Sequence, residues 1–117
     1  MKKLLLCSFL LSSAAAFAEC NTGNVYTDIQ CTEKSLKADK SALNTIYSKI
    51  SADLDAEGKS ELDASQKAWL NYRNKQCNGL LAIYASQAQG AGSKLITLSC
   101  EAGKTYERLQ ELRNLVE

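Results

Sequence analysis

The sequence has 117 residues, of which 23% are charged, and its formal net charge is +1. This length fits one domain with a modest core, and the nearly balanced charge provides no basic face or tail of the kind that binds nucleic acid. The sequence contains no histidine, which removes the commonest general base and the commonest metal ligand. We therefore expect no catalytic residues, no metal site and no cofactor.

The N-terminal segment is typical of a cleaved signal peptide. Two lysines precede the apolar stretch 4–11, and residues 16–18 read Ala-Phe-Ala, the pattern of a cleavage site. The apolar stretch is shorter than the roughly 20 residues that span a bilayer, which argues against a membrane anchor. We expect a signal peptide over residues 1–18 and a periplasmic or secreted domain over residues 19–117 that is not inserted in a membrane.

The cysteines that remain after cleavage indicate two disulfides. They are Cys20, Cys31, Cys77 and Cys100, an even number in a small exported chain. A metal site is the alternative, but the spacings contain no C-x-x-C pair. Lipid attachment at Cys20 is a second alternative, which Glu19 disfavours because a small residue normally precedes the lipidated cysteine.

The pattern of the mature chain indicates an all-α fold. It has no proline, and a first helix is expected from Thr27, which opens the capping-box sequence T-D-I-Q. Apolar residues from Leu36 to Leu54 then recur at helical spacing, up to a stop near Gly58.

Two further helices are expected after this stop. One begins at Ser60, a good N-cap, and ends at the polar loop 87–92. The other runs from Ser93 to about Val116 with apolar residues at the spacing of a bundle helix. Short connections make neighbouring helices antiparallel. The predicted fold is a small antiparallel three-helix bundle with two disulfides.

The expected register of the last two helices selects one disulfide pairing. With their turn centred near Gly90, Cys77 faces the region of Cys100. Four cysteines permit three pairings. We predict Cys77–Cys100, which leaves Cys20–Cys31 to staple the N-terminal arm to the first helix.

The same register reasoning at the first turn places Asp39 near Arg73. We predict a partly buried ion pair between these two residues that fixes the helix register. The alternative is an exposed Arg73 that contacts a ligand. Leu43, Tyr47 and Trp69 are predicted to be core. The aromatic residues Trp69, Tyr72, Tyr84 and Tyr106 are likewise expected in the core, with an aromatic binding surface as the alternative.

No catalytic constellation is evident in the sequence. The acidic residues cluster between 53 and 63, where small polar neighbours favour a solvated turn over the walled cleft that a carboxylate pair needs. Oxidised cysteines cannot act as thiolate nucleophiles. We interpret the chain as a binding protein and not as an enzyme.

Three segments resemble motifs of the LprI-type lysozyme inhibitor-like family. Residues 39–47 resemble its Asp…Leu-Asn-x-x-Tyr motif, residues 65–77 its A-Q-x-x-W-x-x-[YF]-R-[DN]-x-x-C motif, and residues 100–112 its C-x(4)-T-x-x-R-x-x-x-L tail. Ser65 replaces the usual alanine. The resemblance covers roughly residues 20–115 and implies an exported helical domain with disulfides.

The family takes its name from a member that inhibits lysozyme, so the resemblance implies a protein partner such as a lysozyme or another peptidoglycan hydrolase. The loop residues Gln87, Gln89, Ser93 and Lys94 are candidates to enter the cleft of the enzyme and bind a carboxylate. An ordinary connecting loop is the simpler interpretation. The alternative function is a small envelope interaction or structural module, or an immunity-type protein that binds another periplasmic partner.

The cysteine pattern makes a prediction for the exported protein. Mass spectrometry of material from the periplasm should find all four remaining cysteines oxidised and no bound metal, because an oxidising compartment favours disulfides. Four free thiols, or a bound metal ion, would contradict this interpretation.

Overall fold

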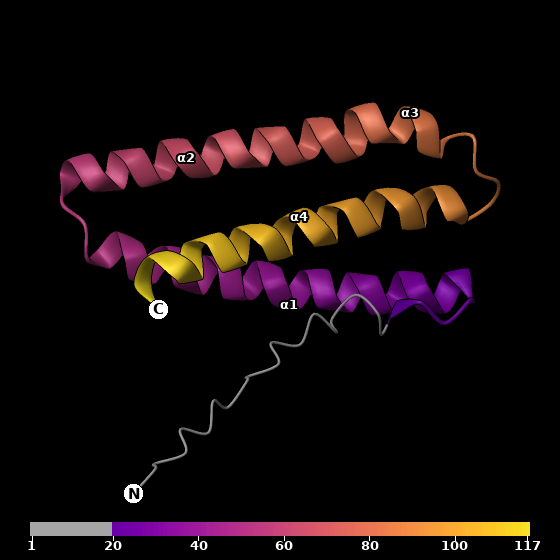
Figure 1. The fold of residues 1–117 in the computed structure, drawn as a ribbon, viewed down its shortest axis with the longest axis horizontal. Helices are drawn as coiled ribbons and strands as arrows, with labels where there is room; N and C mark the ends of the chain where they lie inside the picture. The colour runs from indigo at the N-terminus through magenta and orange to yellow at the C-terminus, as the bar shows by residue number, and fades with distance from the viewer. Residues whose placement is uncertain (1–19) are drawn as a thin grey trace, which may run out of the picture.

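The computed structural model describes residues 20–117, which form helices and turns without a strand. The all-α prediction is confirmed for these residues, whereas the expected signal peptide lies outside them. The helical bounds are α1 (Val25–Ala52), α2 (Ala56–Asn74), the π-helical turn η3 (Lys75–Leu80), α3 (Leu81–Ala85) and α4 (Gly92–Val116). Because α2, η3 and α3 follow one another without a break, residues 20–117 form three long helical segments (Figure 1).

The first helix begins earlier than the sequence indicated. Asn24 is the N-cap, and its side-chain oxygen accepts hydrogen bonds from the backbone amides of Tyr26 and Thr27, both at 3.1 Å. Thr27 therefore lies inside α1 and does not open a capping box. Asparagine is among the best N-cap residues, so a better cap three residues upstream sets the start of the helix.

The starts of the other two long segments also differ from the prediction. Asp55 caps α2 by accepting a hydrogen bond from the amide of Gly58 at 2.8 Å, so Ser60 lies inside the helix. Helix α4 has Ala91 at its N-cap position and no side-chain cap, and Ser93 lies within its first turn. The acidic cluster at the first turn thus includes a capping residue.

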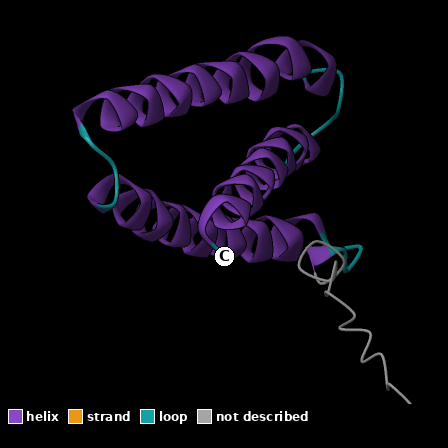
Figure 2. Ribbon diagram, turned by 60° about the vertical axis from the view of Figure 1, so that its left-hand side comes forward, coloured by secondary structure: helices purple, strands orange, loops and turns teal. Residues whose placement is uncertain are grey.

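Helix α4 packs along α1, and its N-terminal part also contacts η3 and α3. Figures 1 and 2 show the chain reversing at both turns, with α4 returning from the end of α3 toward α1. The backbones of α1 and α2 come close to each other at only a few positions. The sequence expectation of an antiparallel bundle assumed direct packing of α1 on α2, whereas α4 supplies most of the surface that covers α1.

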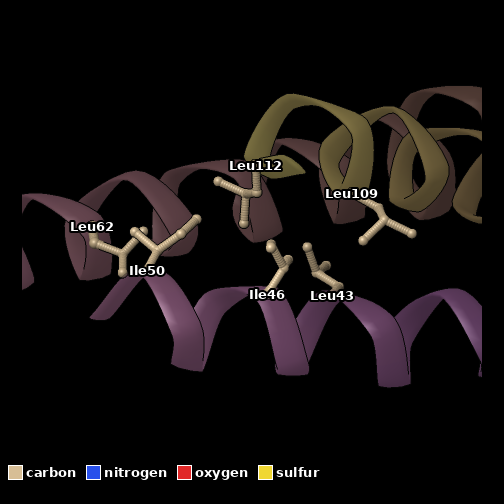
Figure 3. Close-up of a cluster of buried hydrophobic side chains, with 6 residues drawn as sticks. All are labelled: Leu43, Ile46, Ile50, Leu62, Leu109 and Leu112. Atoms are coloured by element: carbon tan, nitrogen blue, oxygen red, sulfur yellow. The ribbon is translucent and has the colours of Figure 1, made fainter. Parts of the chain in front are cut away.

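The apolar core lies where all three segments meet (Figure 3). Leu43 belongs to it, as predicted, while Tyr47 and Trp69 are only partly buried and pack against its edge. These two aromatic residues keep part of their surface toward solvent. The buried cluster consists of Leu43, Ile46, Ile50, Leu62, Leu109 and Leu112.

Two disulfides join the predicted pairs, Cys77–Cys100 from the helix register and Cys20–Cys31 as the remaining pair. Cys77 and Cys100 link η3 to α4 with their Cα atoms 5.5 Å apart, and Cys77 is completely buried. Cys20 and Cys31 link the N-terminal arm to α1 with their Cα atoms 5.4 Å apart. Each bridge contributes on the order of 3 kcal/mol in the chain-entropy account, which is a large share of the stability of so small a domain.

A carboxylate reinforces the N-terminal arm. The side chain of Asp28 accepts hydrogen bonds from the hydroxyl and the amide of Thr22, at 2.7 and 2.8 Å. The hydroxyl bond is the larger cause that holds the pKa of Asp28 below its ordinary value. The arm is therefore fixed to α1 by one covalent and two charge-assisted links.

The core arrangement predicts that alanine substitution of two leucines of α4 will change the free energy of unfolding by very different amounts. Leu109→Ala should lower the free energy of unfolding by about 2–5 kcal/mol, because Leu109 is 2% exposed and its loss leaves a cavity between α1 and α4. Leu115→Ala should change it by less than about 0.5 kcal/mol, because Leu115 is 70% exposed. Urea unfolding followed by circular dichroism measures both, and equal effects would contradict this placement of the core.

Candidate binding surfaces

Side chains of α4 reach across to α2 and hold it in place. The guanidinium of Arg108 donates from Nε to the side-chain oxygen of Gln66 at 3.0 Å and from Nη2 to the hydroxyl of Ser65 at 2.9 Å. Its third nitrogen, Nη1, pairs with Glu111 at 3.1 Å. Arg108 is buried, so these hydrogen bonds form where water screens them little.

A second buried arginine reaches in the opposite direction, from α2 to α4. Arg73 donates from Nη1 to the hydroxyl of Thr105 at 3.1 Å, and that hydroxyl donates in turn to the backbone carbonyl of Glu101. The guanidinium carbon lies 5.1 Å from the ring centre of Trp69, which is a cation–π distance. The Nε of Arg73 is buried and has no hydrogen-bond partner within residues 20–117.

The predicted ion pair between Asp39 and Arg73 is wrong. None of the ion pairs of the described residues includes either side chain. Burial raises the pKa of Asp39, and Arg113 of α4 opposes that shift. The physical reason is the packing order: α4 lies along α1, so Asp39 experiences the charge of an α4 residue, and Arg73 turns to Thr105.

The segments that resemble family motifs meet in these bridges. The segment 65–77 supplies Arg73, the Arg108 acceptors and Cys77, and the segment 100–112 supplies their partners on α4. These residues therefore hold the scaffold together. Side chains available to a partner lie on other surfaces.

The first such surface is a groove between α1 and α2, with a volume of about 420 Å³. Tyr47 and Trp69 contribute partly buried aromatic faces to it, and Arg73 contributes a buried cation. Polar side chains complete the walls. Its lining is Lys40, Leu43, Asn44, Tyr47, Asp63, Gln66, Lys67, Trp69, Leu70 and Arg73.

The second surface includes the loop that the sequence analysis singled out. Gln87 and Gln89 are exposed, Ser93 is half-buried, and Gly90 adopts a positive φ of 61° that favours glycine. The ammonium of Lys94 pairs with Glu33 of α1 at 3.1 Å. The loop thus keeps the side-chain amides of Gln87 and Gln89 for a partner. Lys94, which was expected to bind a carboxylate of the partner, is already paired with the carboxylate of Glu33.

Apolar side chains next to this loop were not singled out from the sequence. Leu80, Ile83 and Tyr84 are 52%, 65% and 64% exposed, and their spacing places them on one face of the helix. No residue from Gln76 to Ser93 carries a charge. This uncharged run is visible in the sequence, whereas the exposure of its apolar members is shown only by the structure. We call residues 80–91 the uncharged tip.

The described residues contain no group of three or more histidine, cysteine or acidic side chains placed to hold a metal ion. In the same part of the chain, no helix combines the length and the apolar character needed to cross a bilayer.

The comparisons with known proteins give one result. A protein-family model described as lysozyme inhibitor LprI matches residues 19–112. No curated protein and no solved structure matches the chain significantly.

The bridging role of Arg108 can be tested by substitution. Arg108→Met removes the hydrogen bonds to Ser65 and Gln66 and should lower the free energy of unfolding by about 2 kcal/mol or more, because hydrogen bonds to charged groups are each worth about 1.5–3 kcal/mol. Lys94→Met should cost less than about 1 kcal/mol, because its ion pair is exposed. Chemical unfolding of both variants makes the comparison, and an equal loss would argue against the bridge.

Proposed function

Because the chain belongs to the family described as lysozyme inhibitor LprI, we propose that it inhibits a peptidoglycan-cleaving enzyme of the lysozyme type. The proposed site of action is the periplasm or the exterior of the cell. Support for export comes from the signal-like residues 1–18 and from the paired cysteines, which suit an oxidising compartment.

The observation that carries the proposal is the uncharged tip. The tip exposes large apolar side chains beside uncharged polar ones. This composition resembles the core of a protein–protein interface, where charged residues are rare and tyrosine is enriched. Leu80, Ile83 and Tyr84 supply the apolar part, and Gln87 and Gln89 supply amide donors and acceptors. The active-site cleft of an enzyme is a concave surface into which the uncharged tip could fit.

The tip is suited to enter a cleft that contains two carboxylates. It carries no carboxylate that would be repelled and no ion that would have to lose its water on binding. The amide groups of Gln87 and Gln89 can donate hydrogen bonds to a carboxylate of the enzyme. Inhibition in this scheme is steric, because the bound tip occupies the space of the substrate.

The tip is also held firmly at its base. Cys77, just before the tip, is buried and disulfide-bonded to Cys100 of α4, and the side-chain amide of Asn78 donates to the carboxylate of Glu101 at 2.6 Å. The ion pair between Lys94 and Glu33 lies just after it. A fixed surface loses less conformational entropy on binding, which favours affinity.

The proposal predicts loss of inhibition when the tip is charged. Ile83→Asp and Tyr84→Asp should each weaken inhibition of cell-wall lysis at least about tenfold, because an unpaired carboxylate would be buried in the interface. Both side chains are largely exposed, so the fold should be retained. The matched control is Leu115→Asp, which changes a leucine of similar exposure near the C-terminus.

The measurement is the turbidity decrease of bacterial cell walls with purified mature protein and lysozymes of the c, g and i types. Inhibition that both tip variants retain would exclude the tip as the contact surface. If none of the three lysozyme types is inhibited at micromolar protein, the lysozyme proposal fails. Capture of a different periplasmic protein would then favour the alternative of an interaction module or an immunity-type protein.

A further inference from the structure

The groove between α1 and α2 is not used by the proposed inhibitory surface, and its side chains have a chemistry of their own. Its volume of about 420 Å³ falls within the range of small-molecule sites. Tyr47 and Trp69 present aromatic surface to it from opposite walls. Flat aromatic faces of this kind favour a ligand with a flat or ring-shaped apolar face.

One end of the groove is cationic. Chain reversal at the α1–α2 turn places Lys40 and Arg73 at the end far from that turn, since each is the lining residue of its helix most distant from it. In the described residues, neither Lys40 nor Arg73 has an ion-pair partner, and the hydrogen bond of Arg73 goes to the neutral hydroxyl of Thr105. Lys67, by contrast, is neutralised by Asp63 at 2.8 Å.

Arg73 gives the strongest indication of an anionic ligand. The residue is 9% exposed, its Nε lacks a hydrogen-bond partner, and no carboxylate of the described residues lies within ion-pairing distance. A buried cation without a counter-ion is unfavourable unless another group compensates it. Contact with Trp69 compensates it in part, and an incoming carboxylate would complete the compensation.

Two amide side chains between the cationic end and the turn can recognise hydroxyl or acetamido groups. Asn44 is exposed on the α1 wall. Gln66 lies on the α2 wall, and because its side-chain oxygen accepts from Arg108, its amide nitrogen remains a donor. An aromatic pair, two amides and two cations, neither of which has an ion-pair partner among residues 20–117, thus line the same groove.

We propose that this groove binds an acidic sugar, with the carboxylate at Lys40 and Arg73, the ring against Trp69 and Tyr47, and ring substituents hydrogen-bonded to the two amides. The site is separate from the tip and requires no enzyme. The protein would then hold a fragment of an acidic polysaccharide while its tip remains free.

Trp69 is the only tryptophan of the chain, so its fluorescence reports directly on the groove. N-acetylmuramic acid is the probe, and N-acetylglucosamine is the matched neutral sugar that lacks the lactyl carboxylate. The acidic sugar should change the Trp69 emission with saturation in the range of about 1 mM or below. The neutral sugar should bind at least about tenfold more weakly.

Substitutions in the groove separate binding from a general effect on folding. Lys40→Gln and Asn44→Ala change exposed residues and should retain the fold, yet each should weaken binding of the acidic sugar several-fold. Ile83→Asp, at the tip, should bind like the unmodified protein. Because no enzyme is present, this result is independent of the lysis assay.

Three outcomes would overturn the proposal. They are an unchanged Trp69 emission at about 10 mM acidic sugar, an equal response to the two sugars, and a response that Lys40→Gln and Asn44→Ala leave intact. The last would place the sugar outside the groove.

Discussion

The position of α2 depends on side-chain bridges to α4 more than on close packing of helices. Arg108 reaches Ser65 and Gln66, and Arg73 reaches Thr105. The Cys77–Cys100 disulfide joins η3, which continues α2, to α4. Close backbone contact between α2 and α4 is sparse. Long arginine side chains can span such a distance with charge-assisted hydrogen bonds, whereas short apolar side chains would leave a void.

Holding α2 from the α4 side leaves its other side partly uncovered. The groove toward α1 exists because the bridges fix α2 at a distance from α1, and Trp69 therefore remains at the edge of the core. The same arrangement explains why Arg73 is buried without a counter-ion among residues 20–117: its hydrogen bond to Thr105 serves the scaffold, and a negative charge is not needed for that contact. The proposed ligand site is thus a consequence of how the scaffold is braced.

Sequence reasoning succeeded where it depended on one short connection and failed where it depended on which helices touch. The loop before α4 is short, so the facing of Cys77 and Cys100 followed from counting residues. The pairing of Asp39 with Arg73 needed α1 to pack closely on α2, whereas α4 packs along α1 and brings Arg113 near Asp39. The predicted starts of the first two helices were wrong for a local reason: Asn24 and Asp55 are stronger or better placed N-caps than Thr27 and Ser60.

The two candidate surfaces differ in how visible they are in a sequence. An uncharged run from Gln76 to Ser93 can be read directly, but only the structure shows that Ile83 and Tyr84 face solvent. The groove cannot be read at all, because its walls come from segments whose spacing is fixed by a third helix. A motif residue such as Arg73 can therefore brace the scaffold through one nitrogen and still leave a charge to attract a ligand. Structural and binding roles need not exclude each other in so small a domain, since each buried cation is close to both the interior and a surface.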